Sequence, residues 1–127
     1  MDYNQLKTKE LSDRTKIFAL RIIKLVQALP DNQVSYIIGK QILRSGTSVG
    51  ANYRASCRAR STAEFVSKLG IVAEEADETL YWLELLVESG QMCEDRLAGL
   101  MKETNEIISI IVSSIKTSKR KAVSKSK

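Results

Sequence analysis

Apolar residues recur at steps of three and four along most of this chain, and that spacing places them on one face of an α-helix. Four segments show the pattern, at about residues 10–29, 35–60, 62–89 and 93–116. In the first segment the face consists of Leu11, Thr15, Phe18, Ile22, Leu25 and Leu29. The sequence therefore predicts an all-α fold with four helices.

Residues that stop or start helices separate the four segments. Pro30, followed by Asp31, cannot easily continue a helix and supplies turn chemistry. Ser61 and Glu64 resemble a capping box, and Gly90 suits the end of a helix. Short connections after the first and third segments make their helices antiparallel neighbours. We therefore expect an up-down-up-down antiparallel four-helix bundle.

Length and composition fit a single domain. With 127 residues, one Pro and six Gly, the chain can bury a core in long helices without disulfides or a metal. We expect residues 1–115 to form the bundle and residues 116–127, half of them basic, to form a disordered tail. The start of the chain lacks the apolar stretch of a secretory signal, and no long uncharged run follows. We expect a cytoplasmic protein without membrane contact.

The middle of the second segment is unusual for a helix. It contains Gly46 and Gly50 among Ser, Thr and Ala, and each Gly costs about 1 kcal/mol relative to Ala in a helix interior. One interpretation is the close approach of another backbone across this spacing, or a kink. The alternative is a loop that divides the segment in two.

The residue types required for most enzyme chemistry are missing. The chain has no His, the commonest general base and metal ligand, and its two cysteines, Cys57 and Cys93, lack the spacing of a zinc or redox motif. The acids of the third segment lie opposite its apolar face, which favours a solvated or partner-facing surface over a metal centre: Glu74, Asp77, Glu78, Glu84 and Glu88. We expect no catalytic residues, no metal and no cofactor.

Charge is unevenly distributed along the chain. Residues 35–60 carry five basic side chains and no acid, residues 61–111 have a net charge of −8, and residues 112–127 carry six basic side chains and no acid. Four cations of the second segment fall within about 80° of one another on a helical wheel, opposite the apolar face: Lys40, Arg44, Arg54 and Arg58. We call these four residues the basic stripe. Arg60, the fifth cation of the segment, falls outside it on the same helical wheel.

Two interpretations of the basic stripe remain open beside a plain solvated surface. In the first, the stripe binds the backbone of RNA or DNA, assisted by three consecutive cations of the tail, Lys119, Arg120 and Lys121. In the second, the protein is an interaction scaffold whose stripe pairs with the acidic third helix of a neighbouring subunit. The first predicts an accessory nucleic-acid-binding protein, and the second predicts that the stripe serves oligomerisation.

Apolar side chains also interrupt the acidic side of the third segment. Ile71, Tyr81 and Leu85 lie there, away from the apolar seam, and Trp82 lies at its border. An exposed apolar set on a helical bundle indicates a protein interface. We expect these four residues to contribute to an oligomer interface.

The run from Gln41 to Tyr53 resembles the signature of the bacterial four-helix-bundle family named for the protein encoded in 23S rRNA intervening sequences. Residues 75–86 resemble that family's third helix, and the likeness covers roughly residues 13–115. The resemblance implies an up-down-up-down bundle that assembles as a ring-like homopentamer, with no catalytic residues assigned.

The chain is also similar to the accessory variability proteins of diversity-generating retroelements. Those proteins are basic pentameric bundles that bind nucleic acid and a reverse transcriptase, so the analogy implies the same two kinds of partner here. Arg44 and Asn52 stand at matching positions, whereas Arg54 does not belong to the general pattern. Many family members have Asn-x-Ala-Glu-Gly where residues 52–56 read Asn-Tyr-Arg-Ala-Ser, so an acid and a glycine are lost and an arginine is gained.

Overall fold

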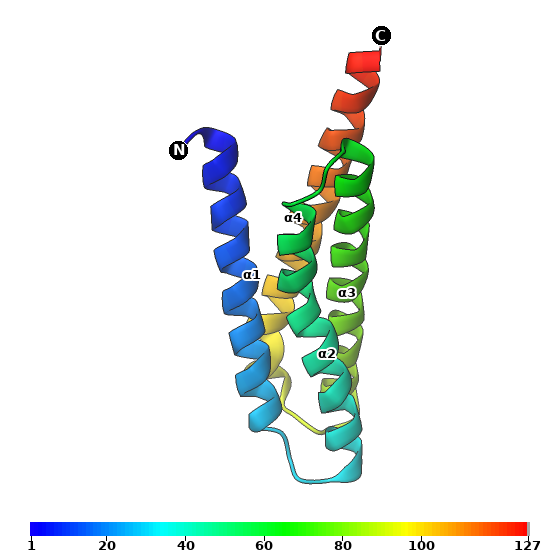
Figure 1. The fold of residues 1–127 in the computed structure, drawn as a ribbon. Helices are drawn as coiled ribbons and strands as arrows, with labels where there is room; N and C mark the ends of the chain where they lie inside the picture. The colour runs from blue at the N-terminus through cyan, green and yellow to red at the C-terminus, as the bar shows by residue number, and fades with distance from the viewer. Residues whose placement is uncertain (127) are drawn as a thin grey trace.

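A computed structural model describes the backbone of residues 1–126 and the side chains of residues 1–124 (Figure 1). It contains four α-helices: α1 (Tyr3–Gln27), α2 (Gln33–Ser56), α3 (Thr62–Glu88) and α4 (Glu94–Ser126). Successive helices run in opposite directions, α2 packs on both α1 and α3, and α4 packs mainly on α3 (Figure 1). The predicted antiparallel four-helix bundle is confirmed. No helix in the described part of the chain has the length and apolar character needed to cross a membrane.

Side chains at the helix starts explain where the helices begin. The Asp2 carboxylate accepts a hydrogen bond from the Gln5 N–H (2.8 Å) and the Gln5 side chain accepts one from the Asp2 N–H (2.9 Å), so α1 begins at Tyr3 instead of near residue 10. Asn32 caps α2 and Ser61 caps α3. Gly90 adopts a left-handed φ of 78° just after α3, as its predicted role at a helix end requires.

The second helix is shorter than the sequence predicts. It ends at Ser56 instead of residue 60. The Cys57 N–H makes the last bond of α-helical spacing, to the Tyr53 carbonyl, and the next two N–H groups bond only three residues back, to Ala55 and Ser56, which tightens the chain into a turn. The chain then enters the cap of α3. Arg58 and Arg60 therefore lie in the α2–α3 connection, where helical-wheel angles no longer apply.

The glycines of α2 allow close packing against α1. The helix is continuous from Gln33 to Ser56, so the interpretation of a dividing loop is wrong. A Cβ atom added at Gly46 would lie 2.7 Å from Ile22 Cγ1, and one added at Gly50 would lie 3.3 Å from the Thr15 carbonyl oxygen. The close approach predicted from the glycine spacing is therefore present.

The core runs along the axis of the bundle and is mainly apolar, with buried Ser and Thr side chains among the apolar ones. Its fully buried large side chains come from all four helices: Phe18, Ile22, Ile42, Leu69, Leu83, Leu86, Leu97, Ile107 and Ile111. One buried polar contact crosses it, where the Thr79 hydroxyl donates to the Ser45 hydroxyl at 2.8 Å. This contact fixes the register of α2 against α3, because a buried hydroxyl pair tolerates no slippage without losing its partner.

The C-terminal segment is helical, not disordered as predicted. Helix α4 continues through residues 116–126, and Lys127 lies outside the described residues. The segment contains neither Gly nor Pro, and each residue added to an existing helix gains a hydrogen bond without a new nucleation cost. Cations near a helix C-terminus also complement its dipole. The tail is therefore a continuation of helix α4.

Candidate nucleic-acid interface

The structure takes Arg44 out of the basic stripe. Its guanidinium donates to Glu75 (3.2 Å) and to Glu78, both on α3 of the same chain. The hydrogen bond to Glu78 is the main cause of a raised pKa for Arg44. The Trp82 indole also donates to Glu78 (3.1 Å). Two carboxylates thus balance the charge of Arg44, and they belong to its own subunit.

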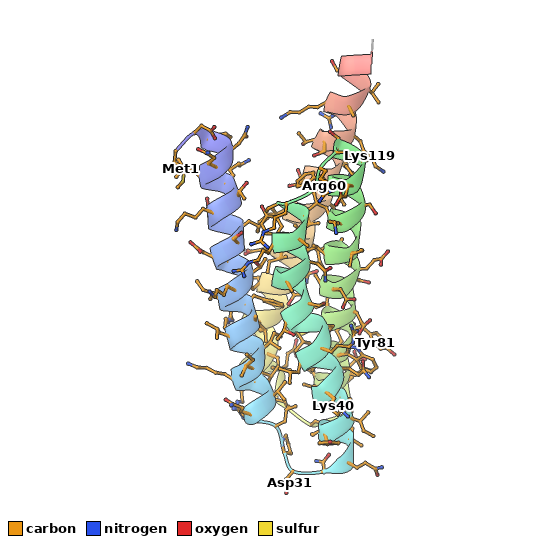
Figure 2. The ribbon with its side chains drawn as sticks, in the orientation of Figure 1. Met1, Asp31, Lys40, Arg60, Tyr81 and Lys119 are labelled. Atoms are coloured by element: carbon orange, nitrogen blue, oxygen red, sulfur yellow. The ribbon has the colours of Figure 1, made fainter. Side chains whose placement is uncertain are left out.

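Lys40 is separated from the other predicted cations. It lies in the first half of α2, and its ammonium group is 5.5 Å from the centre of the Tyr36 ring. Figure 2 shows Lys40 near the end of the bundle that carries the α1–α2 connection, whereas Arg60 and Lys119 lie at the opposite end. Lys40 therefore cannot act together with the C-terminal cations on one short ligand.

The remaining predicted cations gather at one end of the bundle. Helix α2 and helix α4 both run toward this end, and the α2–α3 connection lies there (Figure 1). All the cations of this group are exposed, and none takes part in the ion pairs of the described residues. We call this group the basic end: Arg54, Arg58, Arg60, Lys119, Arg120 and Lys121.

Arg60 is the member of the basic end that the helical wheel excluded. The wheel assumed a helix as far as residue 60, and on that assumption Arg60 fell off the stripe. Because α2 ends at Ser56, the chain turns and Arg60 instead lies beside the last turns of α4. The sequence did contain a signal that could have identified Arg60. Residues 35–60 contain no acid, and this remains true whether or not the backbone is helical as far as residue 60.

A hollow of about 440 Å³ opens at the same end of the molecule. All four helices or their connections contribute to its wall, which includes Thr8, Cys57, Arg60, Phe65, Ser118 and Lys121. Tyr53, four residues before Cys57, is buried, and burial raises the pKa of its phenol above the usual range. Tyr53 is therefore neutral at physiological pH and adds no negative charge here.

The predicted interface residues divide into two pairs. Ile71 and Tyr81 are 41% and 54% exposed, whereas Trp82 and Leu85 are half-buried and pack against the core. The Tyr81 and Trp82 rings meet edge to face with centroids 5.3 Å apart. The apolar surface available on α3 is thus mainly that of Ile71 and Tyr81, with Trp82 holding the Tyr81 ring in place.

Comparison with known proteins agrees with this architecture. Residues 7–113 match the family described as 23S rRNA-intervening sequence protein. The chain is also similar to a solved structure from Bacteroides thetaiotaomicron, a protein of unknown function from the S23 ribosomal protein family. The two share 40% identity with a TM-score of 0.81, over 87% of this chain and 98% of the other. Curated proteins give no significant match. The chain belongs to the 23S rRNA-intervening sequence protein family.

Proposed function

We propose that this protein binds RNA or DNA through the phosphate backbone, as a non-catalytic accessory protein, and that the basic end is the contact surface. The observation that supports the proposal is the gathering of six exposed cations at one end of the bundle, none of which forms an ion pair with another of the described residues. Arg54 lies near the end of α2, and Arg58 and Arg60 lie in the α2–α3 connection. The other three cations lie in α4: Lys119, Arg120 and Lys121.

The arrangement of the cations favours contact with phosphates over reading of bases. Lys119, Arg120 and Lys121 are consecutive in a helix, so they point about 100° apart and spread over about 200° around α4. The cations come from α2, α4 and the α2–α3 connection instead of from one helix face, which suits contact with phosphates along a backbone. Binding should therefore be independent of sequence and strongly dependent on salt.

The test is to measure affinity for duplex DNA and for RNA by fluorescence anisotropy over a series of salt concentrations. The variant Arg54→Gln/Arg58→Gln/Lys119→Gln should bind at least about tenfold more weakly at low salt, and its salt slope should fall by about 2 to 3, because each lost phosphate contact reduces the slope by about 0.9.

A matched control removes the same charge from the other end. Lys24, Lys40 and Arg96 are exposed and lie near the opposite end of the bundle, so Lys24→Gln/Lys40→Gln/Arg96→Gln lowers the net charge equally. This control should keep most of the affinity. Absence of binding at low salt, or equal loss in both variants, would contradict the proposal.

We further infer that the protein assembles into a homo-oligomer through the outer surface of α3. The supporting observation is the exposed pair Ile71 and Tyr81 on α3. Since Arg44 already pairs with Glu75 and Glu78 within one chain, assembly does not need that arginine. Nucleic-acid binding and assembly thus use different surfaces, and both can operate in one protein.

A further inference from the structure

We propose that the hollow at the basic end binds the terminal phosphate of a nucleic-acid strand, a phosphomonoester, in preference to a phosphate within the strand. This proposal rests on the proposed function, because it names a ligand group within the same surface. It assigns separate roles to two members of the basic end: Arg60 and Lys121 line the hollow, whereas Arg54, Arg58 and Lys119 do not.

The charges of the wall match those of a phosphomonoester. Arg60 comes from the α2–α3 connection and Lys121 from α4, so cations approach the hollow from two separate elements. The described residues that line it include no Asp or Glu. A terminal phosphate carries a charge between −1.5 and −2 at about pH 7, whereas a phosphate within a strand carries −1. Two cations with no carboxylate in the wall therefore favour the terminal group. The Glu64 carboxylate, beside the wall, accepts a hydrogen bond from the Arg60 N–H at 3.2 Å.

Hydroxyl groups supply further hydrogen-bond donors around the hollow. Ser61 and Ser118 both line it. The Ser61 hydroxyl oxygen accepts a hydrogen bond from the Glu64 N–H at 3.1 Å, which leaves the hydroxyl proton of Ser61 available to donate. A phosphomonoester has three acceptor oxygens, one more than the two free oxygens of a phosphodiester. The donors thus match a group rich in acceptors.

An apolar ring beside the cations also suits a strand end. The hollow is open to solvent and takes residues from all four helices and the α2–α3 connection, so a nucleotide attached to the bound phosphate can extend out of it. Phe65 adds a half-buried apolar ring to the wall, which offers a surface to the adjoining sugar and base.

The test compares two strands of identical sequence, one with a 5′-phosphate and one with a 5′-hydroxyl, in binding to the full-length protein. The phosphorylated strand should bind about tenfold more tightly, because the group adds charge-assisted hydrogen bonds. Arg60→Gln and Lys121→Gln should each reduce this preference to about twofold or less. The matched control Arg58→Gln should weaken binding of both strands by the same factor and keep the preference.

The two cysteines report where the strand end binds. Cys57 lines the hollow and Cys93 lies in the α3–α4 connection at the opposite end, and both thiols are exposed. The phosphorylated strand should slow alkylation of Cys57 several-fold and leave Cys93 unchanged. Inorganic phosphate at the same concentration should protect Cys57 far less, since it lacks the contacts of the rest of the strand.

The outcomes separate this proposal from the proposed function. A lost preference in Arg60→Gln together with selective protection of Cys57 supports the terminal-phosphate site. Equal binding of the two strands, with the salt dependence intact, overturns this site and leaves the proposed function standing. Protection by inorganic phosphate equal to that by the strand also overturns it, because the hollow would then bind the ion alone. No binding of either strand at low salt overturns both.

Discussion

Gly46 is a point of tight packing between α1 and α2. A Cβ atom there would meet three atoms of Ile22, at 2.7, 2.9 and 3.1 Å, and Ile22 is fully buried. Gly46→Ala gains about 1 kcal/mol of helix propensity but forces apart two packed helices, which typically costs 1–3 kcal/mol or more. We expect a net loss of up to about 2 kcal/mol in the free energy of unfolding, measured by urea denaturation.

Gly70 provides the matched control for this substitution. It lies inside α3, and a Cβ atom added there meets nothing within 4 Å. Gly70→Ala should therefore raise the free energy of unfolding by about 0.5–1 kcal/mol. If both variants were stabilised, the tight packing of Gly46 on Ile22 would be refuted.

For single residues, the sequence predicts contacts that follow from residue type. It does not predict contacts that depend on how far one helix is shifted along its neighbour. Small residues in a helix interior indicate close packing whatever the partner, so Gly46 could be identified in advance. The pairing of Arg44 with Glu75 and Glu78 could not. It requires the axial position of α2 on α3, which the buried contact between Ser45 and Thr79 fixes, and that contact has no signature in the sequence.

At the scale of elements, ion pairs hold the first helix to the last. The Arg14 guanidinium donates two hydrogen bonds to Glu103, at 2.8 and 2.6 Å, and a third to Glu106 at 2.7 Å. Glu103 is mostly buried, with 17% of its side chain exposed. The hydrogen bond from Arg14 is the main cause of a lowered pKa for Glu103. These contacts join α1 to α4 where the two helices share little other packing.

This linkage predicts how stability depends on pH. A carboxylate whose pKa is lower in the folded than in the unfolded protein stabilises the fold above the unfolded value, about 4.3, and the contribution is lost as pH falls through the folded value. Glu103→Gln should therefore cost about 1–2 kcal/mol at neutral pH and flatten the fall in stability below about pH 4.5. Thermal unfolding between neutral and acidic pH measures both effects.

The pair of Lys9 and Asp13 is the control for an exposed ion pair. Its side chains are 62% and 59% exposed and lie four residues apart on α1. Asp13→Asn should change the free energy of unfolding by no more than about 0.5 kcal/mol, because water screens such pairs. Equal losses in Glu103→Gln and Asp13→Asn would rule out a special role for the α1–α4 contact.

Helix ends were less predictable than the helices themselves. The apolar period stops at Ile115, so the basic residues beyond it carried no signal for packing, yet α4 continues because nothing in the segment breaks it. At the end of α2 the predicted helix was too long instead of too short. The apolar and basic spacing predicted a helix to residue 60, but the helix ends at Ser56, with Cys57 as its C-cap and the cap of α3 soon after. Local hydrogen bonding decides such borders, and it is weakly encoded in hydrophobic spacing.

At the scale of the whole molecule, topology brings the cations together. In an up-down-up-down bundle the second and fourth helices end on the same side, so residues near 55 and near 120 meet although they are distant in sequence. This meeting was deducible from the predicted topology and the charge distribution combined. What topology alone could not supply was the loss of Arg44 and the inclusion of Arg60, which depend on side-chain pairing and on the end of α2.

Assembly would multiply the effect of the basic end. In a closed ring the subunits are related by rotation, and with the bundles along the ring axis all basic ends would lie on one side of the ring. Several basic ends on one side would bind a long strand with avidity, whereas a short strand would contact only one of them. Breaking the ring should thus weaken binding of long strands by about tenfold or more and leave short strands nearly unaffected.

Ile71→Glu/Tyr81→Glu tests this dependence, because it places charges on the apolar surface of α3. Light scattering should show a fall in mass, and anisotropy should show the loss of affinity for long strands only. Ile17→Glu/Leu20→Glu is the matched control: these α1 residues are 58% and 54% exposed, and the same charges there should keep both the mass and the affinity. A ring that survives charges at residues 71 and 81 would place the interface elsewhere. If the monomeric variant binds long strands with the same affinity as the oligomer does, avidity is not part of the mechanism.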